Sequence, residues 1–191
     1  MTRVRKLVSA LALIATVSQA AQINRPAIKD STIIRSTVSC AECPDHDCYQ
    51  CRYGQTNTLR ANTGGLAWLR SLVAFRLPED VNPSDIIKCT VQFPAFVKLP
   101  EYAFNMTMVP AVSSNWDEIT VTGTNAPSWW DDAVLYHVPA YTNPPLLDVT
   151  DACWNAAVDG QFSIYIGSQS GSYEIWSKES GNPAVLHVYY G

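Results

Sequence analysis

Residues 114–130 read SNWDEITVTGTNAPSWW and carry a strand signal, a turn signal and aromatic side chains in close succession. The alternation of residues 119–122 predicts a short strand. Gly123 tolerates a positive φ and Pro127 lacks a backbone donor, so regular strand pairing should end there. A loop that gives up backbone hydrogen bonds must be held by side chains, and the indole of Trp116 is a large apolar anchor. The segment therefore predicts a turn-rich loop anchored by Trp116.

Segments rich in β-branched and aromatic residues lie on both sides of this loop. They cover residues 30–38, 53–61, 68–77, 86–97, 101–112, 134–138, 162–167, 173–179 and 183–190. One short helix is expected where Thr150 can cap the N-terminus, with Cys153, Trp154 and Ala157 on its apolar side. Short strands with a turn signal about every ten residues predict an all-β fold, an antiparallel β-sandwich with one short helix.

The length and composition fit one exported domain. The chain has 191 residues, of which 47% are hydrophobic and 16% charged, so it can form a proper core. Residues 1–20 are expected to form a secretory signal peptide, because a basic start precedes an apolar run too short to span a bilayer. The alternative is a buried N-terminal helix. We expect an extended leader at residues 21–29 and a single domain at residues 30–191.

The charge of the expected mature chain narrows the choice of partner. Loss of the signal peptide would remove three positive charges and no negative ones, so the formal net charge would fall from -4 to -7. An acidic domain is not expected to bind nucleic acid or other polyanions unless its cations are clustered. No later segment is long and apolar enough to insert into a membrane. The cations on neighbouring predicted strands are Arg35, Arg60, Arg70 and Arg76.

Six cysteines follow the signal peptide, and an exported protein is expected to oxidise them to disulfides. Four are spaced as Cys40-x2-Cys43-x4-Cys48-x2-Cys51. Zinc ligation is the alternative, although the middle gap is short for a zinc fold. We favour a nested or interleaved pairing of these four over two tight CxxC rings. Cys89 and Cys153 would then remain for each other.

Five short sequence blocks follow one another along the chain. They are Y-G-x-x-x-x-L-R from Tyr53, the strand at residues 68–77, W-D-E-x-T-V-T-x-x-x-A-P from Trp116, D-V-T from Asp148 and W-S-K-E from Trp176. Their order resembles the DNRLRE domain, a family close to the family 96 carbohydrate-binding modules, over about residues 30–190. Lys178 stands where that family has Arg, which loses bidentate geometry toward a carboxylate.

The resemblance implies an extracellular β-sandwich of jelly-roll type with a role in carbohydrate binding. It also implies that Trp116, Trp154 and Trp176 occupy core positions. The cysteine cluster lies where the family has only a loop, so it is expected to form a disulfide-stapled insertion.

No motif for catalysis is present, since both G-x-S-x-G and H-E-x-x-H are absent. The three histidines, His46, His137 and His187, are isolated in the sequence. Glycosidases need two carboxylates across a cleft, whereas the acidic pairs at residues 117–118 and 131–132 are adjacent. We therefore expect no enzyme.

Calcium is the one metal for which the loops offer ligands, and no other cofactor is expected. Extracellular sandwiches bind calcium through carboxylate and carbonyl oxygens. Solvated turn residues are the favoured alternative. The acids that would converge are Asp131, Asp132, Asp148 and Asp151.

The segment Asn105-Met106-Thr107 is the only N-glycosylation sequon in the chain. A glycan on Asn105 would hold that side chain at the surface. The alternative is an unused sequon.

Aromatic side chains are the remaining chemistry, because their flat faces stack on the apolar faces of sugars. The sequence has six Trp and nine Tyr. Of the adjacent pair at residues 129–130, one indole should point inward and the other outward, and we expect Trp130 to be freer. The candidate ligand-binding residues are Trp68, Trp129, Trp130, Tyr136 and Tyr141.

These features predict a secreted, non-catalytic module that binds a polysaccharide through exposed aromatic side chains. Some relatives of the DNRLRE domain are associated with alginate, an anionic polymer, but the acidic charge favours a neutral glycan. The alternative is a structural or adhesive extracellular protein without a sugar site, which would show an exposed edge strand or apolar patch instead.

Overall fold

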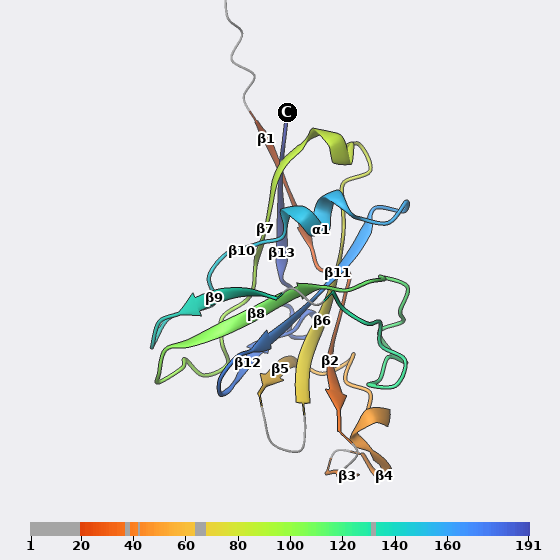
Figure 1. Cartoon of the computed structure of the whole chain (residues 1–191), viewed down its shortest axis with the longest axis vertical. Coiled ribbons are helices and arrows are strands. Elements are labelled where there is room, and N and C mark those ends of the chain that lie inside the picture. The colour runs from red at the N-terminus through yellow and green to blue at the C-terminus, as the bar shows by residue number, and fades with distance from the viewer. Residues whose placement is uncertain (1–19, 37–38, 42, 64–67, 131–132) are drawn as a thin grey trace, which may run out of the picture.

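Two antiparallel sheets pack against each other around a common apolar core (Figure 1). The computed structural model describes residues 20–36, 39–41, 43–63, 68–130 and 133–191. Residues 1–19 of the predicted signal peptide lie outside this part of the chain. Among the described residues, no helix has the length and hydropathy needed to cross a bilayer.

The smaller sheet has four strands, and the N-terminal segment forms one edge of it. The order is β1 (Ala21–Pro26), β13 (Val185–Tyr190), β7 (Ile86–Gln92) and β10 (Leu147–Asp148). β1 lies in the segment expected to be an extended leader, and it pairs with β13 along its whole length. No sequence pattern indicated that residues 21–26 would pair with the last strand.

The larger sheet has seven strands. Its order is β12 (Ser172–Trp176), β5 (Thr58–Asn62), β6 (Trp68–Arg76), β11 (Gln161–Ser168), β8 (Phe104–Pro110) and β9 (Val134–Val138), and β2 (Lys29–Arg35) pairs with β6. The register Phe162↔Phe75 between β11 and β6 places large apolar side chains on one face. The antiparallel β-sandwich predicted from the sequence is confirmed.

The core between the sheets is built from alternating residues of both. Its fully buried members include Val73, Phe75, Ile164 and Ile166 from the larger sheet and Cys89, Val91, Leu186 and Val188 from the smaller one. The helix α1 (Thr150–Trp154) is fixed against β7 by the disulfide Cys89–Cys153. The pairing of these two cysteines was predicted and is confirmed.

Residues 112–130, here called the outer loop, cover the opposite face of the larger sheet. Trp116, Val121 and Ala126 pack there on Leu72 and Tyr165, which point away from the main core. Trp116 is 8% exposed. Its indole N–H donates to the hydroxyl of Ser163 at 3.0 Å. The predicted anchoring role of Trp116 is confirmed.

The strand predicted at residues 119–122 is wrong, because this part of the outer loop consists of turns. The backbone N–H of Val121 donates to the carbonyl of Asp117 at 2.9 Å. The side chains of Asp117 and Asn125 accept from the backbone N–H groups of Thr120 at 3.0 Å and Thr122 at 2.7 Å. Asp and Asn side chains compete with strand pairing for backbone donors, and here the local turns prevail.

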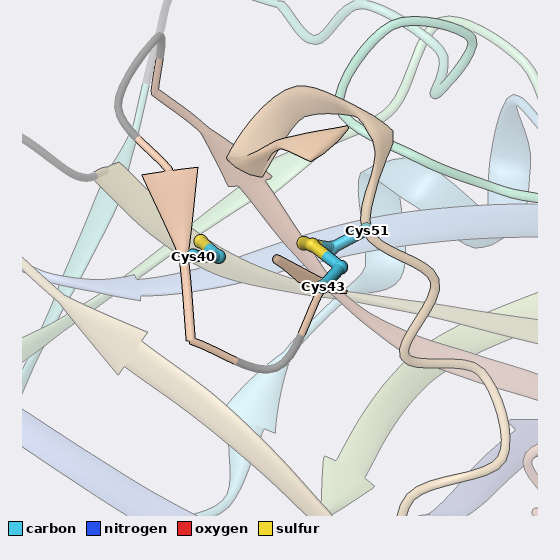
Figure 2. Close-up of side chains that lie close together, drawn as sticks. All are labelled: Cys40, Cys43 and Cys51. Atoms are coloured by element: carbon cyan, nitrogen blue, oxygen red, sulfur yellow. A yellow bond between two sulfur atoms is a disulfide. The ribbon is translucent and has the colours of Figure 1, made fainter. Parts of the chain in front are cut away.

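The cysteine cluster forms a stapled loop at the end of the molecule opposite the C-terminus (Figure 1). It contains β3 (Ser39–Cys40), β4 (Cys43–Asp47) and the 3-10 turn η1 (Cys48–Gln50). The disulfides Cys40–Cys48 and Cys43–Cys51 are interleaved, as one of the predicted patterns requires. Figure 2 shows the Cys43–Cys51 bond beside Cys40. The four thiols that zinc would need are therefore used in disulfides.

Two of the three tryptophans expected in the core are partly exposed. Trp154 is 52% exposed and Trp176 is 37% exposed. Cys153 is turned inward by its disulfide, and the next residue of a helix points about 100° away from it. In β12 the fully buried Ile175 takes the inner face, so its neighbour Trp176 points outward. Local geometry overrides the core positions implied by the family resemblance.

The N-cap predicted at Thr150 is also wrong, because Thr150 is already in the first turn of α1 and Val149 precedes it as the N-cap residue. The carboxylate of Asp148 accepts the backbone N–H of Thr150 at 3.0 Å and its hydroxyl at 2.6 Å. The threonine hydroxyl therefore donates to Asp148 and does not accept a backbone N–H of the helix as an N-cap would. The other short 3-10 turns are η2 (Pro83–Asp85) and η3 (Lys178–Ser180).

Candidate functional site

Trp129 and Trp130 project from opposite sides of a short bridge between the outer loop and the end of β8. Trp129 pairs with Ala111. The backbone N–H of Trp130 donates to the carbonyl of Pro110 at 3.1 Å. Because successive extended residues alternate sides, Trp129 is half-buried against the apolar cluster under the outer loop, while Trp130 is 61% exposed. The prediction that Trp130 is the freer indole is confirmed.

Trp130 lies between two adjoining hollows of about 540 and 640 Å³. Both are lined by Pro110, Trp130, Asp151 and Ala152. The first continues over the start of the outer loop and of β11, and its polar lining includes Ser113, Ser114, Asn155 and Gln161. The second continues over β7, β9 and β10, and it adds Lys88, Val134, Tyr136 and Asp148. We call the two hollows together the Trp130 groove.

Two of the five predicted aromatic residues, Trp130 and Tyr136, meet in this groove. Tyr136 is half-buried, and its hydroxyl donates to the carbonyl of Asp148 at 2.8 Å. Burial raises the pKa of Tyr136 above its usual value, which keeps the phenol protonated. The ring is thus held at a fixed angle on the wall of the second hollow.

The charged side chains of the groove are mainly acidic. Asp148 and Asp151 line it, and Lys88 is the one cation among its described lining residues. The ammonium of Lys88 lies 3.9 Å from the carboxylate of Asp148. A ligand that carries many negative charges would meet repulsion here, whereas hydroxyl groups would meet hydrogen-bonding partners.

Two of the four acids proposed as calcium ligands, Asp148 and Asp151, share the second hollow. Asp131 and Asp132 lie outside the described residues. The carboxylate of Asp148 is already engaged by Thr150 and lies close to Lys88. The calcium site stays a prediction.

Trp68 and Trp129 are brought together elsewhere, on the outer face of the larger sheet. Their rings stack with centroids 4.9 Å apart. The guanidinium of Arg70 lies 4.4 Å from the ring of Trp68 and 4.8 Å from that of Trp129, and the guanidinium of Arg35 lies 4.7 Å from Trp129. We call these four residues the Trp–Arg stack. Its indole faces are covered by one another and by cations, so they are less open to sugar stacking than Trp130.

Only two of the four arginines flagged in the sequence contribute to this stack. The guanidinium of Arg60 lies 4.8 Å from the ring of Tyr53, and Arg76 is exposed at the last position of β6. The alternation of β6 was a usable signal for placing Arg70 on the same face as Trp68. Nothing in the sequence indicated that Trp129 would fold back onto them.

Tyr141 and Asn105 lie away from both aromatic groups. Tyr141 is 68% exposed with φ 58°, its N–H donates to the carbonyl of Pro100 at 2.8 Å, and it lines neither hollow of the groove. Asn105 is half-buried in β8, and its amide donates to the side chain of Gln169 at 2.9 Å. A glycan on Asn105 would replace that bond, and its presence stays a prediction.

A partly buried charge network fixes the base of the outer loop. Lys178 pairs with Glu118 of the loop at 2.8 Å and with Glu179. Asp30 is 2% exposed and accepts the backbone N–H of Lys178 at 2.9 Å. The oxygens of Asp30, Glu118 and Glu179 gather within 4.8 Å of one another, and the ammonium of Lys178 pairs with the two glutamates. Lys178 therefore keeps the acidic partners although it replaces the arginine of the family pattern.

Comparison with known proteins agrees with the family resemblance. Residues 48–190 match the model of carbohydrate-binding module family 96. A protein of Arthroderma benhamiae described as an uncharacterized secreted protein is 58% identical over 189 residues, which cover 96% of each chain. The family match spans every residue that lines the Trp130 groove and three of the four residues of the Trp–Arg stack.

Proposed function

The chain belongs to carbohydrate-binding module family 96, and on that premise we propose that it is a secreted, non-catalytic module that holds a polysaccharide in the Trp130 groove. The observation that carries this proposal is the position of Trp130, 61% exposed between two adjoining hollows. An indole in this position offers a flat apolar face to a sugar ring, while the hollows on each side leave room for neighbouring sugar units.

The polar lining of the groove supports a neutral glycan as the ligand. Asn155 and Gln161 offer amide groups, and Asp148 and Asp151 offer oxygens that accept hydrogen bonds from sugar hydroxyls. The same two acids would repel a polymer of uronic acids.

Binding without catalysis is supported by the roles of the acids in the groove. Glycoside hydrolysis requires one carboxylate as acid and another as base or nucleophile on opposite sides of the scissile bond. Asp148 instead accepts two hydrogen bonds from Thr150 at the start of α1. One oxygen of its carboxylate, Oδ1, is thus committed to the local structure of the helix.

The test is retention on a panel of glycans, with cellulose, β-1,3-glucan, xylan, mannan and chitin as neutral members and alginate and polygalacturonate as anionic ones. Wild type is expected to be retained by at least one neutral glycan. Trp130→Ala should weaken that binding about tenfold or more, the scale of a central aromatic contact. Trp154→Ala is the matched control, because Trp154 is similarly exposed but lines neither hollow.

Each result has a distinct meaning. Equal loss in both variants would indicate a general loss of folding, which circular dichroism would reveal. Equal retention of wild type and Trp130→Ala would remove the groove from the proposal. Retention by no glycan would favour the alternative, a structural or adhesive extracellular protein without a sugar site.

A further inference from the structure

The Trp–Arg stack contains buried hydrogen-bond donors without a partner among the described residues. They are Nε of Arg35, Nη1 of Arg70 and, close beside Arg70, the hydroxyl of Thr107. No nitrogen of Arg70 donates to any described residue, and Nη2 of Arg35 reaches only the backbone carbonyls of Ala126 at 3.3 Å and Pro127 at 3.5 Å. Buried polar groups are rarely left unpaired, so several in one place indicate a missing acceptor.

The sheet is shaped to hold Arg70 close to its surface at this point. A Cβ on Gly167 would lie 3.2 Å from Cγ and 3.3 Å from Nε of Arg70, and 2.7 Å from the hydroxyl of Thr107. Because Gly167 has no Cβ, the side chain of Arg70 can pack directly on β11, with the hydroxyl of Thr107 beside it. Arg70 and Thr107 therefore lie side by side at Gly167, and the guanidinium of Arg35 approaches the same Trp129 ring as that of Arg70.

The positive charges of the stack also lack a negative partner among the described residues. Two guanidinium groups approach the ring of Trp129, and neither forms an ion pair with a carboxylate among the described residues. Burial lowers the pKa of Arg70, and the charge of Arg35 lowers it further. A negative charge placed between them would relieve both effects.

We propose that the Trp–Arg stack binds an oxyanion, which accepts hydrogen bonds from Arg35 and Arg70 while the rings of Trp68 and Trp129 hold the guanidinium groups in place. The planar fork of arginine matches carboxylate, sulfate and phosphate oxygens, and charge-assisted bonds of this kind are the strongest that side chains make. All four residues are only partly buried, so the stack reaches the surface. The site is independent of the Trp130 groove and of its neutral ligand.

The experiment follows the indole N–H signals of 15N-labelled protein during titration with sodium sulfate, with ionic strength held constant by sodium chloride. The signals of Trp68 and Trp129 are expected to shift and saturate, while that of Trp130 stays in place. Arg70→Gln should weaken the apparent affinity for sulfate about tenfold or more. Arg76→Gln is the matched control, since it removes a positive charge from the same strand but outside the stack.

A shift that never saturates, or one that is equal in Arg70→Gln and Arg76→Gln, would overturn the proposal. If Arg70→Gln fails to fold, Arg35→Lys provides the second variant, because it keeps the charge and removes the planar fork. Dextran and dextran sulfate then separate the two sources of the anion. Displacement of free sulfate by dextran sulfate but not by dextran identifies an anionic substituent on a glycan, and no displacement identifies a free inorganic anion.

Discussion

Asp30 is a carboxyl group that the fold keeps almost free of water. Burial is the largest influence on it and raises its pKa from 3.8 to about 7, with a further upward contribution from Glu179 and an opposing one from the backbone N–H of Lys178. The folded state therefore holds a proton on Asp30 at pH values where the unfolded chain has lost it. The contribution of Asp30 to the free energy of unfolding is therefore greatest below about pH 4, where both states are protonated. It is lost as the pH rises through about 7.

Asp30→Asn should remove this pH dependence, because the amide has the same shape and does not titrate. The free energy of unfolding of wild type relative to the variant is expected to fall by about 3 kcal/mol between pH 4 and pH 7. Urea denaturation across that range measures it, with the exposed Asp80→Asn as a control for net charge. If the free energy of unfolding changed with pH by the same amount in wild type and in Asp30→Asn, the assignment of this pH dependence to Asp30 would be wrong.

Gly54 is required by a close approach between two of the five sequence blocks, those that begin at Tyr53 and Trp116. A Cβ on Gly54 would lie 1.8 Å from the carbonyl oxygen of Glu118 and 2.7 Å from its carbon. Gly54→Ala should therefore displace the base of the outer loop and cost about 3 kcal/mol. Gly171→Ala should cost only about 1 kcal/mol, since its Cβ meets open space and the strain of φ +76° is the whole effect. Thermal denaturation compares the two variants. Equal losses of stability would contradict the close approach of Gly54 to Glu118.

At the scale of elements, the disulfides differ in how much chain they close. Cys89–Cys153 joins residues 64 apart, whereas Cys43–Cys51 joins residues 8 apart. Closing a longer loop removes more entropy from the unfolded chain, so replacing the first pair by alanine should cost about 4 kcal/mol and replacing the second about 2.5 kcal/mol. Guanidinium denaturation of the two double variants tests this order. A larger loss of stability on removal of Cys43–Cys51 than on removal of Cys89–Cys153 would contradict it.

The strands were the part of the fold that the sequence revealed best. β9 (Val134–Val138) has the predicted bounds, and β6 (Trp68–Arg76) ends one residue before the predicted segment does. Apolar alternation is a local signal, and the fold keeps it wherever one face of a strand meets the core. Residues 119–122 alternate as well, but the side chains of Asp117 and Asn125 take their backbone donors, and the outer loop folds into turns.

For the molecule as a whole, the sequence predicted which residue types would form a site but not which of them would meet. Trp130 and Tyr136 share the groove because residues 128–130 bridge to the end of β8, and Trp68 meets Trp129 because the outer loop folds back across the sheet. Both contacts depend on long-range pairing, which no local pattern contains. The amide lining by Asn155 and Gln161 was likewise not indicated by the sequence, whereas Asp148 and Asp151 were grouped there only as calcium ligands.

The two aromatic groups form two surfaces of different chemistry. The Trp130 groove is acidic and leaves one indole free, while the Trp–Arg stack is cationic and covers its indoles. They lie on opposite sides of the bridge that carries Trp129 and Trp130. A neutral glycan and an oxyanion are therefore expected to bind without competing for the same side chains.

The central claim is that a polysaccharide is held at Trp130, and calorimetric titration with an oligosaccharide of the retained glycan tests it most directly. The account predicts saturable binding to wild type and to Trp154→Ala, with the affinity of Trp130→Ala about tenfold lower or beyond detection. Equal affinities of wild type and folded Trp130→Ala would contradict it.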